Sequence, residues 1–221
     1  MRLNLRLIGN TEPVPFDHLH QLTGALHKWL GWNDLHDDIS LYSFGWLQGA
    51  QRRNGALTFP RGATWRVSFH EAAAAKRLLE GILRDPEVAY GMRVFEVQEQ
   101  ATPAFSGCYR FFVDGPVVAR RTRDDGGRDY LLWDDKASDE VLTRVLRHKL
   151  DAAGFAREHL DATVQFDRTY AHPRTKLATI KGTRHRGNEC PVVVTGTTEA
   201  VRFAWLVGVG ELTGSGFGAL R

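Results

Sequence analysis

Histidine is the residue type in this 221-residue chain that is best suited to catalysis, and the chain has nine histidines. Imidazole gains and loses a proton near neutral pH, so a well-placed histidine acts as a general acid or base. The sequence contains no H-E-x-x-H motif, facial-triad spacing or cysteine pair that would indicate a metal site. The sequence therefore favours neither a catalytic metal nor a cofactor. The candidates are His18, His20, His27, His36, His70, His148, His159, His172 and His185.

Composition excludes several classes of protein. Apolar residues make up 43% of the chain and charged residues 25%, which is typical of a folded protein rather than a disordered one. Cys108 and Cys190 lie far apart in the sequence, so no disulfide framework is expected. The first ten residues alternate in polarity, and no apolar run is long enough to span a membrane. We expect a cytoplasmic protein without membrane association.

The first half of the chain has the pattern of a ferredoxin-like βαββαβ unit. Leu3, Leu5 and Leu7 alternate as in a strand, and a helical apolar pattern follows and ends at Gly31. A segment rich in strong helix-forming residues starts at Glu71 and ends before Pro86. We assign residues 1–100 to an N-terminal domain. Its six elements begin near Leu3, Phe16, Ile39, Trp65, Glu71 and Met92.

Residues 108–221 are predicted to form a second, distorted copy of the same α+β unit. The segment from Gln100 is small, polar and contains proline, as expected of a junction. A strand begins at Cys108, and a helix around Glu140 ends near Gly154. We predict that strands starting at Ala162 and Lys176 form a hairpin through His172 and Pro173. A strand from Pro191 and a final helix capped by Thr197 complete the unit.

One stretch of this second half is far more basic than the chain's net charge of +3. No acidic residue occurs between Asp167 and Glu189. Such a field is typical of a groove that follows nucleic-acid phosphates, although an exposed hairpin with solvated charges is an alternative interpretation. The basic residues are Arg168, Arg174, Lys176, Lys181, Arg184 and Arg186.

Glycines are concentrated in the last fifteen residues, "VGVGELTGSGFGALR". A nucleotide-binding loop is disfavoured, because such loops precede a helix and here a helix comes before the glycines. A helix end at Gly208, a turn at Gly214 and Gly216, and a last short strand would account for some of them. The full pattern suggests a backbone that lies flush against another surface.

The pattern Gly208-Val209-Gly210, five residues, Gly216-Phe217-Gly218 resembles the C-terminal glycine-rich signature of the CRISPR repeat-processing endoribonucleases. These enzymes belong to the repeat-associated RNA-binding (RAMP) superfamily. The resemblance extends through the strand, helix and glycine-rich loop at the end of the chain. It implies two tandem ferredoxin-like domains that span nearly the whole chain and a metal-independent cut within each CRISPR repeat. The expected products carry a 2′,3′-cyclic phosphate and a 5′-hydroxyl.

The resemblance also implies site residues. Its catalytic histidine lies in or just after the first helix, a position that His36 matches best. His20 and His27 lie seven residues apart on one side of the first helix, where both could simply be solvated; otherwise His27 is the candidate for a second proton-transfer group, with His20 as the other choice. Either Lys28 or Arg52 could supply a cation. RNA would bind to the six basic residues named above and to the loop glycines Gly208, Gly210, Gly216 and Gly218.

Two other functions stay open at this stage. A guide-RNA-binding subunit of a CRISPR effector complex would share the fold without cutting RNA. A small α/β protein with another RNA or protein partner would pack its glycine loop only against its own sheet. The expected partner is CRISPR repeat RNA in a precursor transcript. Further effector-complex subunits and a homodimer are left open, and no membrane partner is expected.

Overall fold

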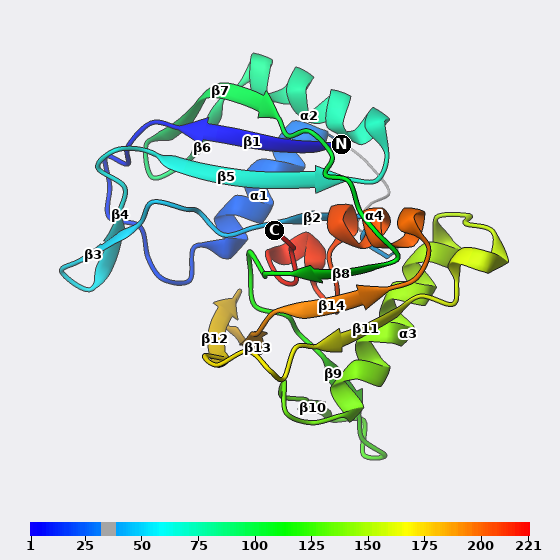
Figure 1. Ribbon diagram of the computed structural model, residues 1–221. Coiled ribbons are helices and arrows are strands. Elements are labelled where there is room, and N and C mark those ends of the chain that lie inside the picture. Colours follow the sequence, from blue (N-terminus) through cyan, green and yellow to red (C-terminus); the bar gives the residue numbers. More distant parts are fainter. Residues whose placement is uncertain (32–38) are drawn as a thin grey trace.

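A computed structural model describes residues 1–31 and 39–221 of the chain (Figure 1). The first half contains a five-stranded antiparallel sheet in the order β2-β5-β1-β7-β6. Without the short edge strand β6, this is the strand order of a ferredoxin-like unit. The elements are β1 (Arg2–Leu7), α1 (Leu19–Leu30), β2 (Tyr42–Phe44), β3 (Gln51–Arg53), β4 (Ala56–Thr58), β5 (Ala63–Phe69), α2 (Ala72–Arg84), β6 (Glu87–Ala89) and β7 (Met92–Glu99).

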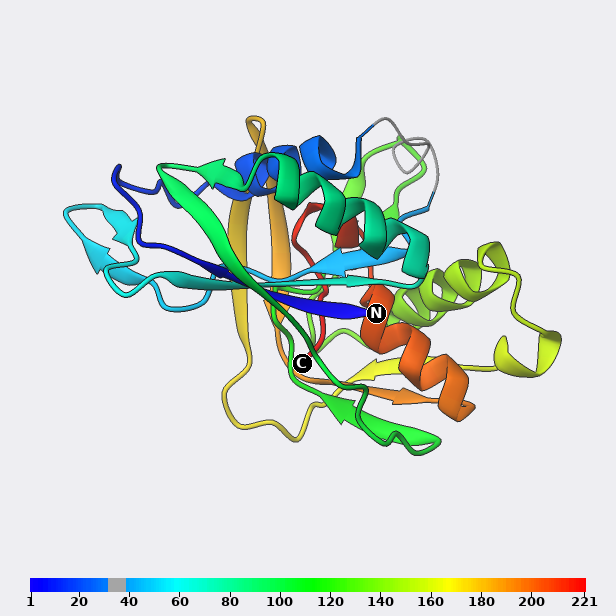
Figure 2. The ribbon, with the colours of Figure 1, turned by 90° about the horizontal axis from the view of Figure 1, so that it is seen from above.

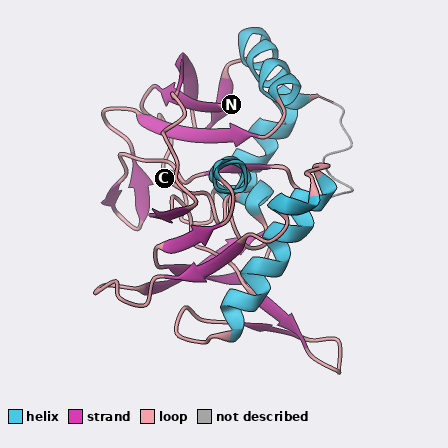
Figure 3. Ribbon diagram, turned by 45° about the vertical axis from the view of Figure 1, so that its right-hand side comes forward, coloured by secondary structure: helices cyan, strands magenta, loops and turns pink. Residues whose placement is uncertain are grey.

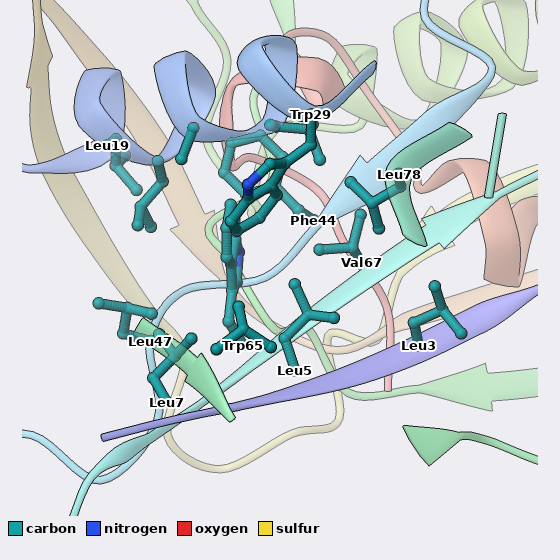
Figure 4. Packing of buried hydrophobic residues seen from close by; sticks show 14 of the residues in the cluster. Leu3, Leu5, Leu7, Leu19, Trp29, Phe44, Leu47, Trp65, Val67 and Leu78 are labelled. Atoms are coloured by element: carbon teal, nitrogen blue, oxygen red, sulfur yellow. The ribbon is translucent and has the colours of Figure 1, made fainter. Parts of the chain in front are cut away.

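Alternation in β1 builds the first core. Leu3, Leu5 and Leu7 are buried, whereas Arg6 between them is exposed. Figure 4 shows the three leucines beneath α1, with Trp29 of that helix between α1 and the sheet. Helices α1 and α2 pack on each other and on this sheet (Figure 2). The sheet's other face turns toward the second half of the chain.

The second half repeats the unit with a smaller sheet in the order β11-β14-β8 (Figure 1). Figure 3 shows the helices and strands of both halves in separate colours. Leu220 bridges Val113 just beyond β8, where the fourth strand of a ferredoxin-like sheet would lie. A second buried cluster fills this half. The elements are β8 (Cys108–Phe111), β9 (Arg120–Thr122), β10 (Arg128–Tyr130), α3 (Ala137–Ala152), β11 (Thr163–Phe166), β12 (Arg174–Ile180), β13 (Thr183–Glu189), β14 (Val192–Thr195) and α4 (Thr198–Val207).

The predicted α+β fold of tandem ferredoxin-like units is confirmed. The cap of the last helix also forms, because the Thr197 side chain accepts a hydrogen bond from the backbone N–H of Ala200. In the described part of the chain, no helix is both long and apolar enough to cross a membrane.

The predicted hairpin through His172 and Pro173 is wrong. β11 pairs with β14, and β12 pairs with β13. The turn lies at Lys181 and Gly182, which both have positive φ, 47° and 81°. Positive φ at both central residues is the geometry of a two-residue type I′ hairpin turn. Figure 2 shows this hairpin extending past α1 of the first half.

The carboxyl end of α4 joins the two halves. The carbonyl of Trp205 accepts a hydrogen bond from the Arg2 guanidinium of β1, and that guanidinium also stacks on the Trp205 ring at 3.8 Å. The next carbonyl, of Leu206, accepts one from Ser43 Oγ of β2 at 2.8 Å. The last carbonyls of a helix have no partner within it, so donors from the first half satisfy them here.

Candidate nucleic-acid interface

The β12–β13 hairpin carries five of the six basic residues predicted to bind RNA. Arg174, Lys176, Lys181, Arg184 and Arg186 are all exposed. The strand register places Leu177 opposite Arg186 and Ala178 opposite His185. Because Ala178 and His185 are buried, that face of the hairpin turns inward. The opposite face, with Arg184 and Arg186, turns toward solvent.

The sixth basic residue, Arg168, is tied to α3. Its guanidinium donates to Asp139 Oδ2 at 2.6 Å and to the Asp135 carbonyl at 3.1 Å. Asp139 also accepts a hydrogen bond from the backbone of Phe166, which connects α3 with β11. This side chain therefore has a structural ion pair in addition to its predicted role in RNA binding.

A groove of about 660 Å³ lies between the halves, and we call it the interdomain groove. Its first-half wall includes Phe16 and Trp46, and its second-half wall includes Phe112 and Tyr170. Three cationic residues also line it: Arg174, Lys176 and Arg221. Lys176 Nζ lies 4.4 Å from the centre of the Trp46 ring and 3.6 Å from Glu189. Aromatic faces beside cations are the means by which single-stranded nucleic acid is bound.

Aromatic and cationic side chains alternate at one end of the interdomain groove. Arg110 lies 4.7 Å from the ring centre of Phe112 and 5.7 Å from that of Tyr170. Arg110 Nε donates to Asp167 Oδ2 at 2.6 Å, which holds the guanidinium in place. Hydrogen bonds from Thr169 and Arg110 lower the pKa of this carboxyl group, so it remains charged. Phe112 keeps 43% of its surface exposed and is available for stacking.

Sequence reasoning missed these aromatic residues. None of them was among the predicted RNA-binding residues, and the neighbouring Phe111 is in the core. The signal for Phe112 was its place directly after an inward-facing phenylalanine in "CYRFF", since neighbouring strand residues face opposite ways.

A second hollow, of about 610 Å³, lies between α3 and the glycine-rich segment 208–218, and we call it the α3 cavity. Ile39 and Ser40, just before β2, also line it. On α3 it is lined by Arg144, His148 and Lys149. The first half, α3 and the C-terminal segment therefore meet at one place.

Lys149 is the buried one of these three α3 residues, with 2% of its surface exposed. Its ammonium donates to the Val207 carbonyl at 3.1 Å and to Thr213 Oγ1 at 2.8 Å. Within the described ranges it has no carboxylate partner. Burial lowers the pKa of Lys149 from 10.5 to about 7, because the charged form is deprived of water.

The glycine-rich segment packs against both halves of the chain. A Cβ on Gly214 would come within 2.7 Å of the side-chain oxygens of Ser40 and Tyr42. Trp46 donates its indole N–H to the Gly216 carbonyl at 2.7 Å. This packing differs from that of the alternative in which the segment contacts only its own sheet.

The four glycines predicted to bind RNA are all buried and have positive φ: Gly208, Gly210, Gly216 and Gly218. The backbone of Gly218 donates to the Pro116 carbonyl at 3.0 Å and accepts from Val209 at 2.9 Å. These glycines shape the turn that borders the α3 cavity. Their contact with RNA stays a prediction.

Of the predicted proton-transfer residues, the structure describes His27 and His20 but not His36. His36 lies in residues 32–38, outside the described residues. His27 is half-buried in the second half of α1. His20, the other choice, is hydrogen-bonded to the Asp17 carbonyl at 3.0 Å.

The two candidate cations have partners within the first half. Lys28 pairs with Asp85 at 2.9 Å and donates to the Glu87 carbonyl. Arg52 lies 5.2 Å from the ring centre of Phe16, which lines the interdomain groove. Nothing in these contacts assigns either residue to a scissile phosphate.

Two ferredoxin-like units with a basic, aromatic groove between them define the chain as a tandem ferredoxin-like protein. The family described as CRISPR associated protein Cas6, C-terminal, matches residues 100–221, which is more than half of the chain. The chain therefore belongs to the Cas6 family. A comparison with curated proteins gives no match.

Solved structures share the whole fold. The chain is similar to the product of a Cas6-related gene from Pyrococcus furiosus, with 18% identity and a TM-score of 0.86 over 100% of this chain and 97% of that one. A RAMP protein described as binding different RNA substrates shares 17% identity, with a TM-score of 0.83 over 100% and 98%. A Cas6 product complex shares 16% identity, with a TM-score of 0.71 over 100% and 98%.

Proposed function

We propose that this protein is a metal-independent endoribonuclease that cuts CRISPR precursor transcripts within each repeat. The proposal takes residues 1–100 and 108–221 as two domains that bind the RNA between them. The observation that carries it, in a chain of the Cas6 family, is the interdomain groove, where aromatic side chains of both halves lie beside cationic side chains of the second half. The Cas6 product complex with the same fold supports the assignment of RNA as substrate.

The proposed reaction needs only the RNA and two proton-transfer groups. A base removes the proton of a 2′-hydroxyl, and that oxygen forms a bond to the adjacent phosphorus. The bond between phosphorus and the 5′-oxygen breaks, and an acid gives that oxygen a proton. The products are a 2′,3′-cyclic phosphate and a 5′-hydroxyl. We assign His36 as one of these groups and His27 as the other, without assigning which is acid and which is base.

RNA would follow the basic side of the molecule. Phe112 and Tyr170 offer faces on which bases stack, and Arg174 and Lys176 lie beside them for the phosphates. Arg184 and Arg186 on the outer face of the hairpin extend this positive field. Phosphate contacts of this kind supply affinity that falls with salt.

The test is a cleavage assay in EDTA. The purified protein is incubated with a labelled repeat RNA from a CRISPR locus of the same genome, and the products are separated on a sequencing gel. We expect one cut per repeat and a cyclic phosphate end. His36→Ala and His27→Ala are expected to lower the single-turnover rate by about 10²-fold or more while RNA binding persists.

His159→Ala is the matched control, since this histidine lies outside the interdomain groove and has no assigned role in RNA binding or proton transfer. At saturating protein its cleavage rate is expected to equal that of the wild type. Tight binding with no cut by the wild type would instead make the chain a guide-RNA-binding subunit. A cut that survives His36→Ala would refute the role of His36 and direct the search to His27 and His20.

A further inference from the structure

The α3 cavity is separate from the interdomain groove, and no described residue lines both. On α3, Arg144 and His148 are exposed and Lys149 is buried. Arg144 and His148 are four residues apart and share one side of the helix, and Lys149 lines the same cavity beside them. The cavity therefore has a buried cation and two further nitrogen donors beside it.

The charges around this cavity do not balance. Of its described lining residues, Glu211 is the one carboxylate, and Arg120 already holds it through Nε at 2.8 Å and through a second guanidinium nitrogen. Arg144, His148 and Lys149 have no ion-pair partner among residues 1–31 and 39–221. Among the described lining residues, positive charge therefore exceeds negative charge once the Arg120–Glu211 ion pair is set aside.

A buried ammonium without a carboxylate is costly, because two neutral acceptors replace only part of its hydration. The carboxyl end of α4, at Val207, favours a positive charge and offsets part of that cost. An anion in the adjoining cavity would supply the missing negative charge. A tetrahedral anion with several acceptor oxygens suits a lysine, an arginine and a histidine together.

We propose that the α3 cavity binds one phosphate group of the RNA backbone, held by Lys149 with Arg144 and His148 on its exposed side. The inference rests on the proposed RNA-binding function and adds a phosphate site outside the interdomain groove. RNA bound in this way contacts the glycine-rich turn through the cavity wall that Thr213 and Gly214 form.

The site makes RNA binding take up a proton. The pKa of free Lys149 is lowered to about 7, so above that pH the free protein holds mostly the neutral amine. A bound phosphate favours the ammonium and raises its pKa again. Among the described residues, the other titratable or charged groups that face the cavity are Arg144 and His148 of α3, Arg120 of β9 and Glu211 of the glycine-rich segment.

Isothermal titration calorimetry tests the coupling. The wild type and Lys149→Met are titrated with the repeat RNA, made uncleavable by a 2′-deoxy nucleotide at the mapped cut, in buffers of different ionisation enthalpy. Near pH 8.5 the wild type is expected to take up about one proton more than Lys149→Met. Between pH 7 and 8.5 its RNA affinity is expected to fall by roughly tenfold more than that of the variant.

The matched control is Lys176→Met, which removes an exposed lysine from the interdomain groove. It should weaken RNA binding but keep the same proton uptake as the wild type. If the wild type and Lys149→Met take up the same number of protons on binding RNA, the phosphate site is overturned. Cleavage of unmodified repeat RNA by the wild type would still leave the proposed function intact. Uptake without any cut would reject the nuclease and keep the site.

Inorganic phosphate is titrated as a second ligand, because a free anion could satisfy the same donors. If the protein takes up the proton when it binds inorganic phosphate, and takes up no further proton when RNA is then added, the RNA backbone is rejected as the ligand. If Lys149→Met does not fold, Arg144→Gln with His148→Gln, both on the exposed side, provides the second variant. It should weaken RNA affinity by about tenfold, and an unchanged affinity would overturn the proposal.

Discussion

Replacing Lys149 by methionine tests whether burial destabilises the charged form of this lysine. In the folded protein the pKa of Lys149 is lowered to about 7, against 10.5 in the unfolded chain. Below pH 7 both states hold the proton, and the folded state bears the full cost of burying the charge. Between these two pKa values the unfolded state binds more protons, so the contribution of Lys149 to stability rises with pH.

The magnitude follows from the two pKa values. From pH 6 to pH 9 the folded state loses its proton while the unfolded state keeps it. At about 1.4 kcal/mol for each unit above pH 7, this one group adds about 2–3 kcal/mol to the free energy of unfolding. A methionine at 149 cannot titrate, so this increase is absent from the variant. Hydrogen bonds lost from Val207 and Thr213 lower its stability equally at both pH values.

The assay is urea unfolding followed by tryptophan fluorescence at pH 6, 7, 8 and 9. The difference in unfolding free energy between Lys149→Met and the wild type should favour the variant by about 2–3 kcal/mol more at pH 6 than at pH 9. Lys76→Met, which replaces a lysine side chain that is 79% exposed on α2, should show a constant difference. A constant difference for Lys149→Met as well would refute the reasoning about its burial.

Three further changes probe the hairpin, the glycine-rich segment and the groove. Replacing Arg184 and Arg186 by alanine should weaken RNA binding and reduce the slope of log affinity against log salt by about 1.4, measured by filter binding. Gly218→Ala should lower the free energy of unfolding by about 2–4 kcal/mol in urea titrations, because its φ is +63° and a Cβ would overlap the Val209 carbonyl. Phe112→Ala should cost about 1–3 kcal/mol of RNA affinity through lost stacking.

Each of these changes has a control of the same residue type. Arg77→Ala on α2 should leave the salt slope unchanged, and an equal loss there would make the hairpin arginines ordinary surface charges. Gly126→Ala, with positive φ but open space around it, should cost only about 1 kcal/mol. Phe95→Ala on β7, 60% exposed and away from the groove, should not change RNA affinity. If it weakens binding as much as Phe112→Ala, the groove is not the stacking site.

Long periodic segments of the sequence predicted the fold well. Alternation from Leu3 to Leu7 predicts β1, and the apolar pattern before Gly31 predicts α1. Strands β3, β4, β6, β9 and β10 were missed, because each has three residues, too few for an alternating pattern to be recognised. The turn of the β12–β13 hairpin was misplaced because Pro173 was taken as the turn signal. The actual turn is at Lys181 and Gly182, and a lysine gives no sign in the sequence that it adopts a positive φ.

The site was less predictable than the fold, since it depends on residues far apart in the chain. Phe16, Trp46, Phe112 and Tyr170 meet in one groove only after both halves pack. Lys149, in the sequence "RHKL", has the pattern of an exposed helix residue. It is buried because the end of α4 and the turn at Thr213 lie over it. Local periodicity carries no information about such contacts.

The carboxyl end of α4 also determines how the molecule can come apart. Three successive carbonyls, of Trp205, Leu206 and Val207, accept hydrogen bonds from β1, β2 and α3 respectively. Pulling the halves apart would strip two of the three donors at once and expose the Trp205 ring that Arg2 covers. If one half unfolded first, the other half would therefore lose these hydrogen bonds and the Arg2–Trp205 contact. The chain should unfold in a single cooperative transition, and the width of the groove should stay fixed while RNA enters it.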